Sequence, residues 1–125
     1  MIKRRDENML VVFYSETGNV ATFVEKTGLE TFEVVTGDET IDQPFVVVTP
    51  TTGDGEAPYE LTLFLDEHKD YIRGVAASGD LAWGDSYGAA ARVIAEEYDV
   101  PVIHVFELEG TDEDVTTFVD AVKAL

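Results

Sequence analysis

The sequence predicts a single α/β domain in which helices cover both faces of a doubly wound, five-stranded parallel sheet. Short apolar runs alternate along the chain with segments whose apolar residues recur at helical spacing, and this alternation is typical of such a sheet. The run Phe45–Thr49 is apolar almost throughout, as expected for a strand buried on both faces. The chain has 125 residues, of which 45% are hydrophobic, so one domain with a substantial core is expected.

The first half of the chain is predicted to form three strands and two helices. The strands are Leu10–Tyr14, Thr31–Val35 and Phe45–Thr49. The first helix starts at Asn19, and Gly28 is its C-terminal stop signal; its apolar face consists of Val20, Phe23 and Val24. The link 36–44 is too short for a crossover helix. Pro58 can open the second helix, whose apolar face consists of Leu61, Phe64 and Leu65.

The second half of the chain is predicted to add two strands and two helices. The strands are Ile72–Ser78 and Val102–Phe106. The helix between them has an apolar face of Ala91, Ile94, Ala95 and Tyr98, and Pro101 lies beyond its end. A capping box at Thr111-Asp-Glu-Asp114 starts the last helix, which should bury Val115, Phe118, Val119 and Val122. Residues 1–8 are expected to be a flexible extension.

The composition excludes several classes of partner. The chain has 26 Asp and Glu against 8 Lys and Arg, a formal charge of −18 that repels nucleic acid and anionic membranes. The longest apolar runs have the length of strands, whereas a membrane-spanning helix needs about 20 residues. The chain has no cysteine, which excludes disulfides and thiolate metal sites. Its start shows no secretory pattern, so a cytoplasmic location is expected.

Three polar loops follow the first, third and fourth predicted strands. The carboxyl ends of parallel strands share one edge of the sheet, where α/β proteins bind their ligands. All three loops combine glycine, which permits close backbone approach, with hydroxyl or amide side chains. Their sequences are Ser15-Glu-Thr-Gly-Asn, Thr49-Pro-Thr-Thr-Gly-Asp-Gly and Ser78-Gly-Asp-Leu-Ala-Trp-Gly-Asp.

The first of these loops suits a phosphate group. It leads directly into a predicted helix at Asn19, and a helix N-terminus offers unpaired N–H groups and the positive end of the helix dipole. The loop contains no Lys or Arg. Neutral donors of this kind favour one phosphate monoester over a triphosphate with magnesium. From this segment alone, an ordinary strand–helix turn with a good N-cap remains the alternative.

The third loop suits a planar ring. Trp83 is the only tryptophan of the chain, and a Trp on a glycine-rich edge is better placed to stack on a ligand than to fill a core. Neither a G-x-G-x-x-G dinucleotide motif nor a P-loop motif is present. A receiver domain would need acidic residues where the chain has Tyr14-Ser15 and Thr49-Pro50. One phosphate with one planar ring predicts flavin mononucleotide (FMN).

Several longer segments carry a family resemblance that covers the chain from Met9 onward. They are Ser15-Glu-Thr-Gly-Asn-Val, Phe23-Val-Glu-Lys-Thr-Gly-Leu, Pro44-Phe-Val-Val-Val-Thr-Pro-Thr, Gly74-Val-Ala-Ala-Ser-Gly, Trp83-Gly-Asp, Val100-Pro-Val and Phe106-Glu-Leu-Glu-Gly-Thr-Asp-Glu-Asp-Val. These segments resemble the NrdI family of small flavodoxin-like FMN proteins that serve class Ib ribonucleotide reductase. The resemblance implies a flavodoxin-like sheet of strand order 2-1-3-4-5.

The resemblance also implies a function and a set of site residues. In this family the reduced flavin reacts with dioxygen, and a superoxide-type oxidant passes to the dimanganese centre of the small reductase subunit, NrdF, where it helps to form the tyrosyl radical. A reductant of the flavin, of unknown identity, is a further partner. The implied phosphate-loop residues are Ser15, Glu16, Thr17, Gly18, Asn19 and Val20. The implied neighbours of the ribityl chain and the N5 edge are Thr49, Pro50, Thr51, Thr52 and Gly53, within the segment 49–55. The implied ring contacts are Ser78, Gly79, Asp80, Trp83, Gly84 and Asp85.

The chain departs from the family pattern at two places. Thr51-Thr52 stands where many relatives have an aromatic residue, so a flavin would be stacked mainly on one side. Asp80 stands where asparagine is common, and its carboxylate would disfavour an anionic reduced ring. His68 and His104 are each isolated in sequence and are interpreted as structural, and no residue is assigned an acid–base role. Two alternatives remain open: a short-chain flavodoxin that carries single electrons, and a flavin-free binding module.

Overall fold

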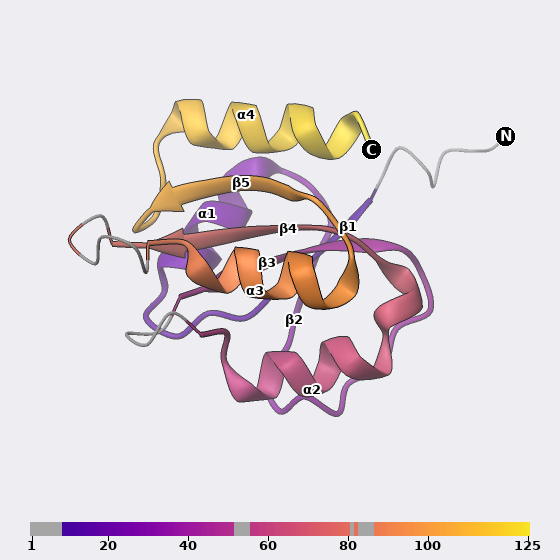
Figure 1. Ribbon diagram of the computed structural model, residues 1–125. Helices are drawn as coiled ribbons and strands as arrows, with labels where there is room; N and C mark the ends of the chain where they lie inside the picture. The colour runs from indigo at the N-terminus through magenta and orange to yellow at the C-terminus, as the bar shows by residue number, and fades with distance from the viewer. Residues whose placement is uncertain (1–8, 52–55, 81, 83–86) are drawn as a thin grey trace, which may run out of the picture.

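The computed structural model describes residues 9–51, 56–80, 82 and 87–125. Its elements follow one another in the predicted order (Figure 1). The strands are β1 (Leu10–Phe13), β2 (Thr31–Glu33), β3 (Phe45–Pro50), β4 (Ile72–Gly79) and β5 (Val102–Glu107). The helices are α1 (Asn19–Thr27), α2 (Tyr59–Glu67), the short 3₁₀ helix η2 (Lys69–Tyr71), α3 (Ala89–Tyr98) and α4 (Asp112–Lys123).

The strands form one parallel sheet of order β2-β1-β3-β4-β5, which confirms the predicted topology. Helices α1 and α4 cover one face of this sheet, and α2 and α3 cover the other (Figure 1). The order reverses between β1 and β3, because the chain moves outward from β1 to β2 and then returns to the other side of β1. The fold therefore has a topological switch point beside β1, where proteins of this architecture bind ligands.

The core has two layers because the central strands are buried on both faces. On the side of α1 and α4, Phe23 stacks on Phe106 with ring centroids 3.8 Å apart and meets the edge of Phe118 at 5.3 Å. On the other side, Phe64 of α2 packs against Phe45 of β3. Aromatic pairs in these geometries add to the stabilisation from buried area. The sheet is therefore fixed from both faces, which gives the loops at its carboxyl edge a rigid base.

The link from β2 to β3 contains no helix, as its length predicted, and it is held instead by His68. The His68 ring is buried; its Nε2 accepts the Ile41 N–H at 3.1 Å, and its Nδ1 lies 2.7 Å from the Phe64 carbonyl oxygen. Since a carbonyl oxygen can only accept and an N–H can only donate, the ring is neutral with its proton on Nδ1. The structural role expected for His68 follows from these two bonds.

Strand β2 ends two residues before its predicted end, because its backbone donors change partners. The carboxylate of Glu39 accepts the N–H groups of Val35, Thr36 and Gly37 at 2.8, 3.0 and 2.9 Å. Burial alone would raise the pKa of Glu39, but these bonds outweigh it and lower the pKa to about 2. A local side chain thus replaces the strand ladder at this point.

The helix boundaries follow the predicted signals closely. Gly28 closes α1 with a left-handed backbone, and Asp99 closes α3 in the same way before Pro101 is reached. The capping box of α4 is present at Thr111 and Asp114. In α4 the predicted apolar face is buried only in part: Phe118 and Val122 are buried, whereas Val115 and Val119 are half-buried. Among the described residues, no helix is long and apolar enough to cross a membrane.

Candidate functional site

The loop between β1 and α1 delivers an open helix N-terminus to the carboxyl edge of the sheet. Gly18 occupies the N-cap position with a φ of 97°, which glycine adopts without strain, and it makes no side-chain cap. The Ser15 hydroxyl accepts the N–H of Ala21 at 3.2 Å. In an α-helix that begins this way, the N–H groups of Asn19 and Val20 have no acceptor within the helix. They are the donors that an anion at this loop would meet.

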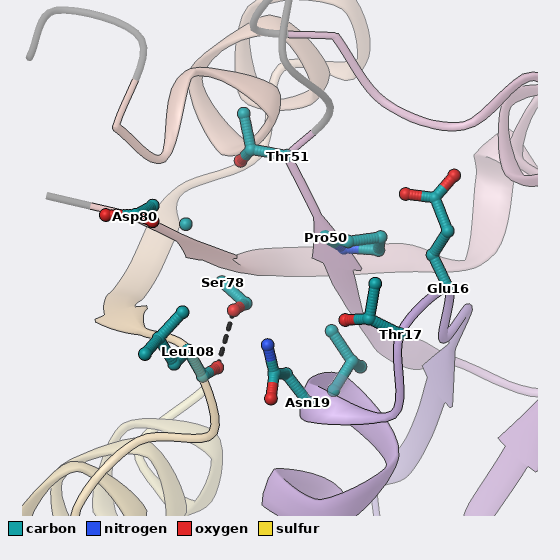
Figure 2. A pocket seen from close by; sticks show the side chains of 10 residues that line it. Glu16, Thr17, Asn19, Pro50, Thr51, Ser78, Asp80 and Leu108 are labelled. Atoms are coloured by element: carbon teal, nitrogen blue, oxygen red, sulfur yellow. Dashed lines mark hydrogen bonds between the residues drawn. The ribbon is translucent and has the colours of Figure 1, made fainter. Parts of the chain in front are cut away.

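A pocket of about 450 Å³ opens in front of this helix N-terminus (Figure 2). Its size is that of a site for a small organic ligand. Four loops build its wall, those that follow β1, β3, β4 and β5. The lining residues are Glu16, Thr17, Asn19, Val20, Pro50, Thr51, Ser78, Gly79, Asp80 and Leu108.

Thr51 brings an unpartnered hydroxyl to this pocket. Its side chain is 4% exposed, and among the described residues its Oγ1 has no hydrogen-bond partner. The neighbouring Thr49 is fully buried, and its Oγ1 donates to the Pro50 carbonyl oxygen at 2.8 Å. A buried hydroxyl without a partner is costly, so Thr51 differs from Thr49 in carrying an unsatisfied polar group.

Ser78 uses its hydroxyl to hold the backbone of the pocket wall. Its Oγ donates to the Leu108 carbonyl oxygen at 2.6 Å (Figure 2). The Leu108 N–H donates in turn to the Gly79 carbonyl oxygen at 2.9 Å. The loop after β5 is thereby fixed to the end of β4. Leu108 is a lining residue that the sequence analysis did not predict. Its position directly after a strand of the parallel sheet was the signal that could have identified it.

The pocket wall is acidic and carries no cationic side chain among its lining residues. Glu16 and Asp80 lie on opposite sides of it (Figure 2). The Asp80 carboxylate accepts the N–H of Ala82 at 2.9 Å. Beside the first loop, Tyr14 donates its hydroxyl to Glu60 at 3.4 Å, and burial, the charge and hydrogen bond of Glu60 and the charge of Glu16 together raise the pKa of Tyr14. An anionic ligand in this pocket would therefore be held by neutral donors: backbone N–H groups, hydroxyls and the Asn19 amide.

The structure brings most of the predicted site residues together. Nine of the lining residues were predicted, all of them except Leu108. Ser15, Gly18 and Thr49 do not line the pocket; the first two shape the start of α1, and Thr49 lies buried beneath the loop. The predictions at Thr52, Gly53, Trp83, Gly84 and Asp85 lie outside the described residues.

His104 is paired with a carboxylate away from this pocket. Its Nε2 lies 2.8 Å from Oδ1 of Asp114, the capping-box residue of α4. Burial works to raise the pKa of Asp114, but hydrogen bonds from Thr111 and His104 lower it. The pair ties β5 to the first turn of α4, in keeping with the structural role expected for His104.

A parallel sheet of order 2-1-3-4-5 with a pocket at the switch point is the flavodoxin-like fold. The family model described as "NrdI Flavodoxin like" matches residues 11–120. Protein NrdI of Bacillus licheniformis is 43% identical over 113 residues, which cover 90% of this chain and 86% of that protein. The chain belongs to the NrdI flavodoxin-like family.

Solved structures agree on the fold. A short-chain flavodoxin associated with a non-canonical PDU bacterial microcompartment is similar with a TM-score of 0.72 and 21% identity, over 94% of this chain and 95% of that one. A flavoprotein in complex with FMN from Lactobacillus acidophilus has a TM-score of 0.61 and 20% identity, over 90% of this chain and 98% of that one. At these identities the likeness concerns the fold.

Proposed function

We propose that this protein binds FMN in the pocket at the start of α1 and acts as a redox accessory protein of class Ib ribonucleotide reductase. The observation that carries the proposal is the unpartnered, buried hydroxyl of Thr51 in a pocket that begins at the N-terminus of α1, in a chain of the NrdI family. Free N–H donors at one end of the pocket and an unsatisfied hydroxyl further along match a ligand with a phosphate attached to a polar chain.

Each part of the pocket has a distinct task in holding FMN. The phosphate would be held by the N–H groups of Asn19 and Val20 and by the Thr17 hydroxyl, which lie at the start of α1. The Thr51 hydroxyl would be the donor available to the ribityl chain or the adjoining ring edge. The residues at the end of β4, together with Leu108, border the ring. The predicted stacking partner Trp83 lies outside the described residues.

The residues of the pocket would bind and orient FMN and set the charge around it, and the bound group would supply electron transfer and, when reduced, the reaction with dioxygen that gives a superoxide-type oxidant. The dimanganese centre of NrdF would receive the oxidant, and a separate reductant would supply the electrons to the flavin. No side chain of the pocket has to move a proton in this scheme. With Glu16 and Asp80 in the wall and 26 acidic residues in the chain, the surroundings oppose further negative charge on the ring.

A one-electron carrier is the second candidate. It is favoured by the similarity to a short-chain flavodoxin, which extends over 94% of this chain. The two functions differ in the partner and in the handling of dioxygen: a carrier passes single electrons to another protein, whereas the accessory protein delivers an oxidant.

Binding is tested first, by titration of the flavin-free protein with FMN, riboflavin and FAD. FMN should bind more tightly than riboflavin, because riboflavin lacks the phosphate. It should also bind more tightly than FAD, because the neutral donors of the first loop favour one phosphate monoester. Thr17→Ala should weaken FMN but leave riboflavin unchanged, and Thr62→Ala on α2, whose hydroxyl bonds to the Tyr59 carbonyl oxygen, is the matched control. Preference for FAD, or no binding of FMN, would refute the cofactor assignment.

The redox role is tested by mixing the reduced protein with manganese-loaded NrdF of the same organism and dioxygen. Tyrosyl radical should form, as measured by electron paramagnetic resonance, and added superoxide dismutase should inhibit only weakly because the oxidant passes within a complex. If no radical forms and the protein instead supports a flavodoxin-dependent reductase, the carrier function is correct.

A further inference from the structure

Leu108 has a backbone conformation that leucine rarely adopts. Its φ is 54°, in the left-handed region, and among the described residues Asp99 at 57° is the one other non-glycine with a positive φ. Asp99 closes α3, and aspartate tolerates this conformation comparatively well. A bulky residue in the same region is an outlier, and such outliers concentrate at functional sites.

Two hydrogen bonds hold Leu108 in this conformation. Both of its backbone polar groups are bound to the end of β4, the N–H to Gly79 and the carbonyl oxygen to the Ser78 hydroxyl. Two residues further on, Gly110 has a φ of 75°, and a Cβ there would meet Phe23 Cδ1 at 2.7 Å. The loop is therefore fixed on both sides of Leu108, and a shift of Leu108 would break bonds to the strand that borders the pocket.

The fixed backbone holds the apolar side chain of Leu108 at the wall of the pocket and not in the core. Leu108 is 48% exposed and lines the pocket beside Ser78 and Asp80 (Figure 2). The polar groups suited to phosphate lie on the loop after β1, at Thr17 and Asn19. At the β4 end of the pocket, Leu108 is the lining residue with a large apolar side chain.

We propose that Leu108 is a ring-binding residue whose side chain forms an apolar wall against the flat ring of the flavin. The inference rests on the proposed FMN site and adds a fourth loop, the one after β5, to the three that the sequence indicated. A ring packed on Leu108 covers apolar surface that is otherwise exposed to water, and this burial favours binding. Because the contact is with the ring, it stabilises any ligand that carries the ring, whether or not a phosphate is attached.

The substitution Leu108→Asn tests the wall while keeping the backbone, because asparagine tolerates the left-handed region better than other polar residues. Affinities are measured for FMN and for lumiflavin, which has the ring without ribityl chain or phosphate. Both should fall by the same factor, about five- to tenfold, as expected when about half of a leucine side chain is no longer covered. The control Asp99→Asn, at the other positive φ, should leave both affinities unchanged.

A second measurement uses the unaltered chain and does not depend on folding of a variant. In methyl NMR spectra, lumiflavin should shift the Leu108 methyl resonances through the ring current. Those of Leu63, an exposed leucine of α2 outside the pocket, should remain in place.

The outcomes separate this inference from the proposed function. If the unaltered protein binds neither FMN nor lumiflavin, the proposed function fails. If it binds them, unshifted Leu108 methyl resonances would refute the proposed contact between Leu108 and the ring. A Leu108→Asn variant that is folded and keeps its lumiflavin affinity would refute it as well. A loss confined to FMN would also overturn it, since the contact would then lie with the ribityl chain or the phosphate.

Discussion

Replacing Thr51 by valine should affect the flavin-free protein and the complex in opposite directions. Valine has nearly the shape of threonine but lacks the hydroxyl. In the flavin-free protein the Thr51 Oγ1 is buried and has no partner among the described residues. Removing such a group should stabilise the fold by about 1–2 kcal/mol, the lower part of the mutational range for buried unpaired hydroxyls. For a chain of 125 residues, each kcal/mol corresponds to a rise in Tm of about 4 °C.

Thr49→Val is the matched control. Thr49 lies two residues earlier, is equally buried and donates to the Pro50 carbonyl oxygen at 2.8 Å. Its replacement should therefore destabilise the flavin-free protein by about 1 kcal/mol, the usual net contribution of a hydrogen bond. Two identical substitutions on one segment should thus have effects of opposite sign.

Binding supplies the second half of the test. If the Thr51 hydroxyl bonds to the flavin, Thr51→Val should weaken FMN by about three- to tenfold, which corresponds to one hydrogen bond. Urea unfolding gives the free energy of unfolding without FMN, and fluorescence titration gives the affinity. The reasoning is refuted if Thr51→Val destabilises the flavin-free protein as much as Thr49→Val does. A stabilised variant with unchanged FMN affinity would show that the hydroxyl does not meet the ligand.

Three further predictions concern single charged or buried groups. Glu39 has a pKa of about 2 in the folded protein against an ordinary value of 4.5, so its carboxylate stabilises the fold above about pH 4.5 and loses this effect as the pH falls towards 2. In Glu39→Gln this part of the pH dependence of Tm should disappear. An unchanged profile would contradict the role of the Glu39 carboxylate as the acceptor of these backbone N–H groups. His68→Phe should lower the free energy of unfolding by about 1–3 kcal/mol, because the Ile41 N–H loses its acceptor, and nitrogen chemical shifts of the unaltered protein should place the proton on Nδ1. Asp80→Asn should raise the potential for full reduction of bound FMN, because it removes a negative charge from the pocket wall, and the shift should shrink with added salt; a lowered or unchanged potential would place Asp80 away from the ring.

The fold could be predicted from the sequence because its signals are local. Apolar faces at helical spacing and buried apolar runs gave the elements in order, and Gly28 and Thr111 marked helix ends that the structure has at the same places. The extent of β2 could not be predicted, since it depends on the bonds from the Glu39 carboxylate to Val35 and Thr36. Nothing in local strand propensity distinguishes a backbone donor that will bond to a neighbouring strand from one that will bond to a side chain.

The site residues also divide into those that local sequence signals predict and those that depend on packing. Three of its loops could be predicted because a parallel sheet must bring the loops after its strands to one edge. The different roles of Thr49 and Thr51 could not, because both are threonines of one segment and only packing decides which hydroxyl finds a partner. The position of Leu108 after a strand could have placed it at the same edge, but its conformation could not be predicted. Its φ of 54° and its exposure depend on bonds to Ser78 and Gly79, about 30 positions earlier in the chain, and no local pattern assigns a leucine to the left-handed region. The conformation of this pocket residue is therefore set by contacts distant in sequence, whereas the start of α1 at Gly18 and Asn19 is set by its local sequence.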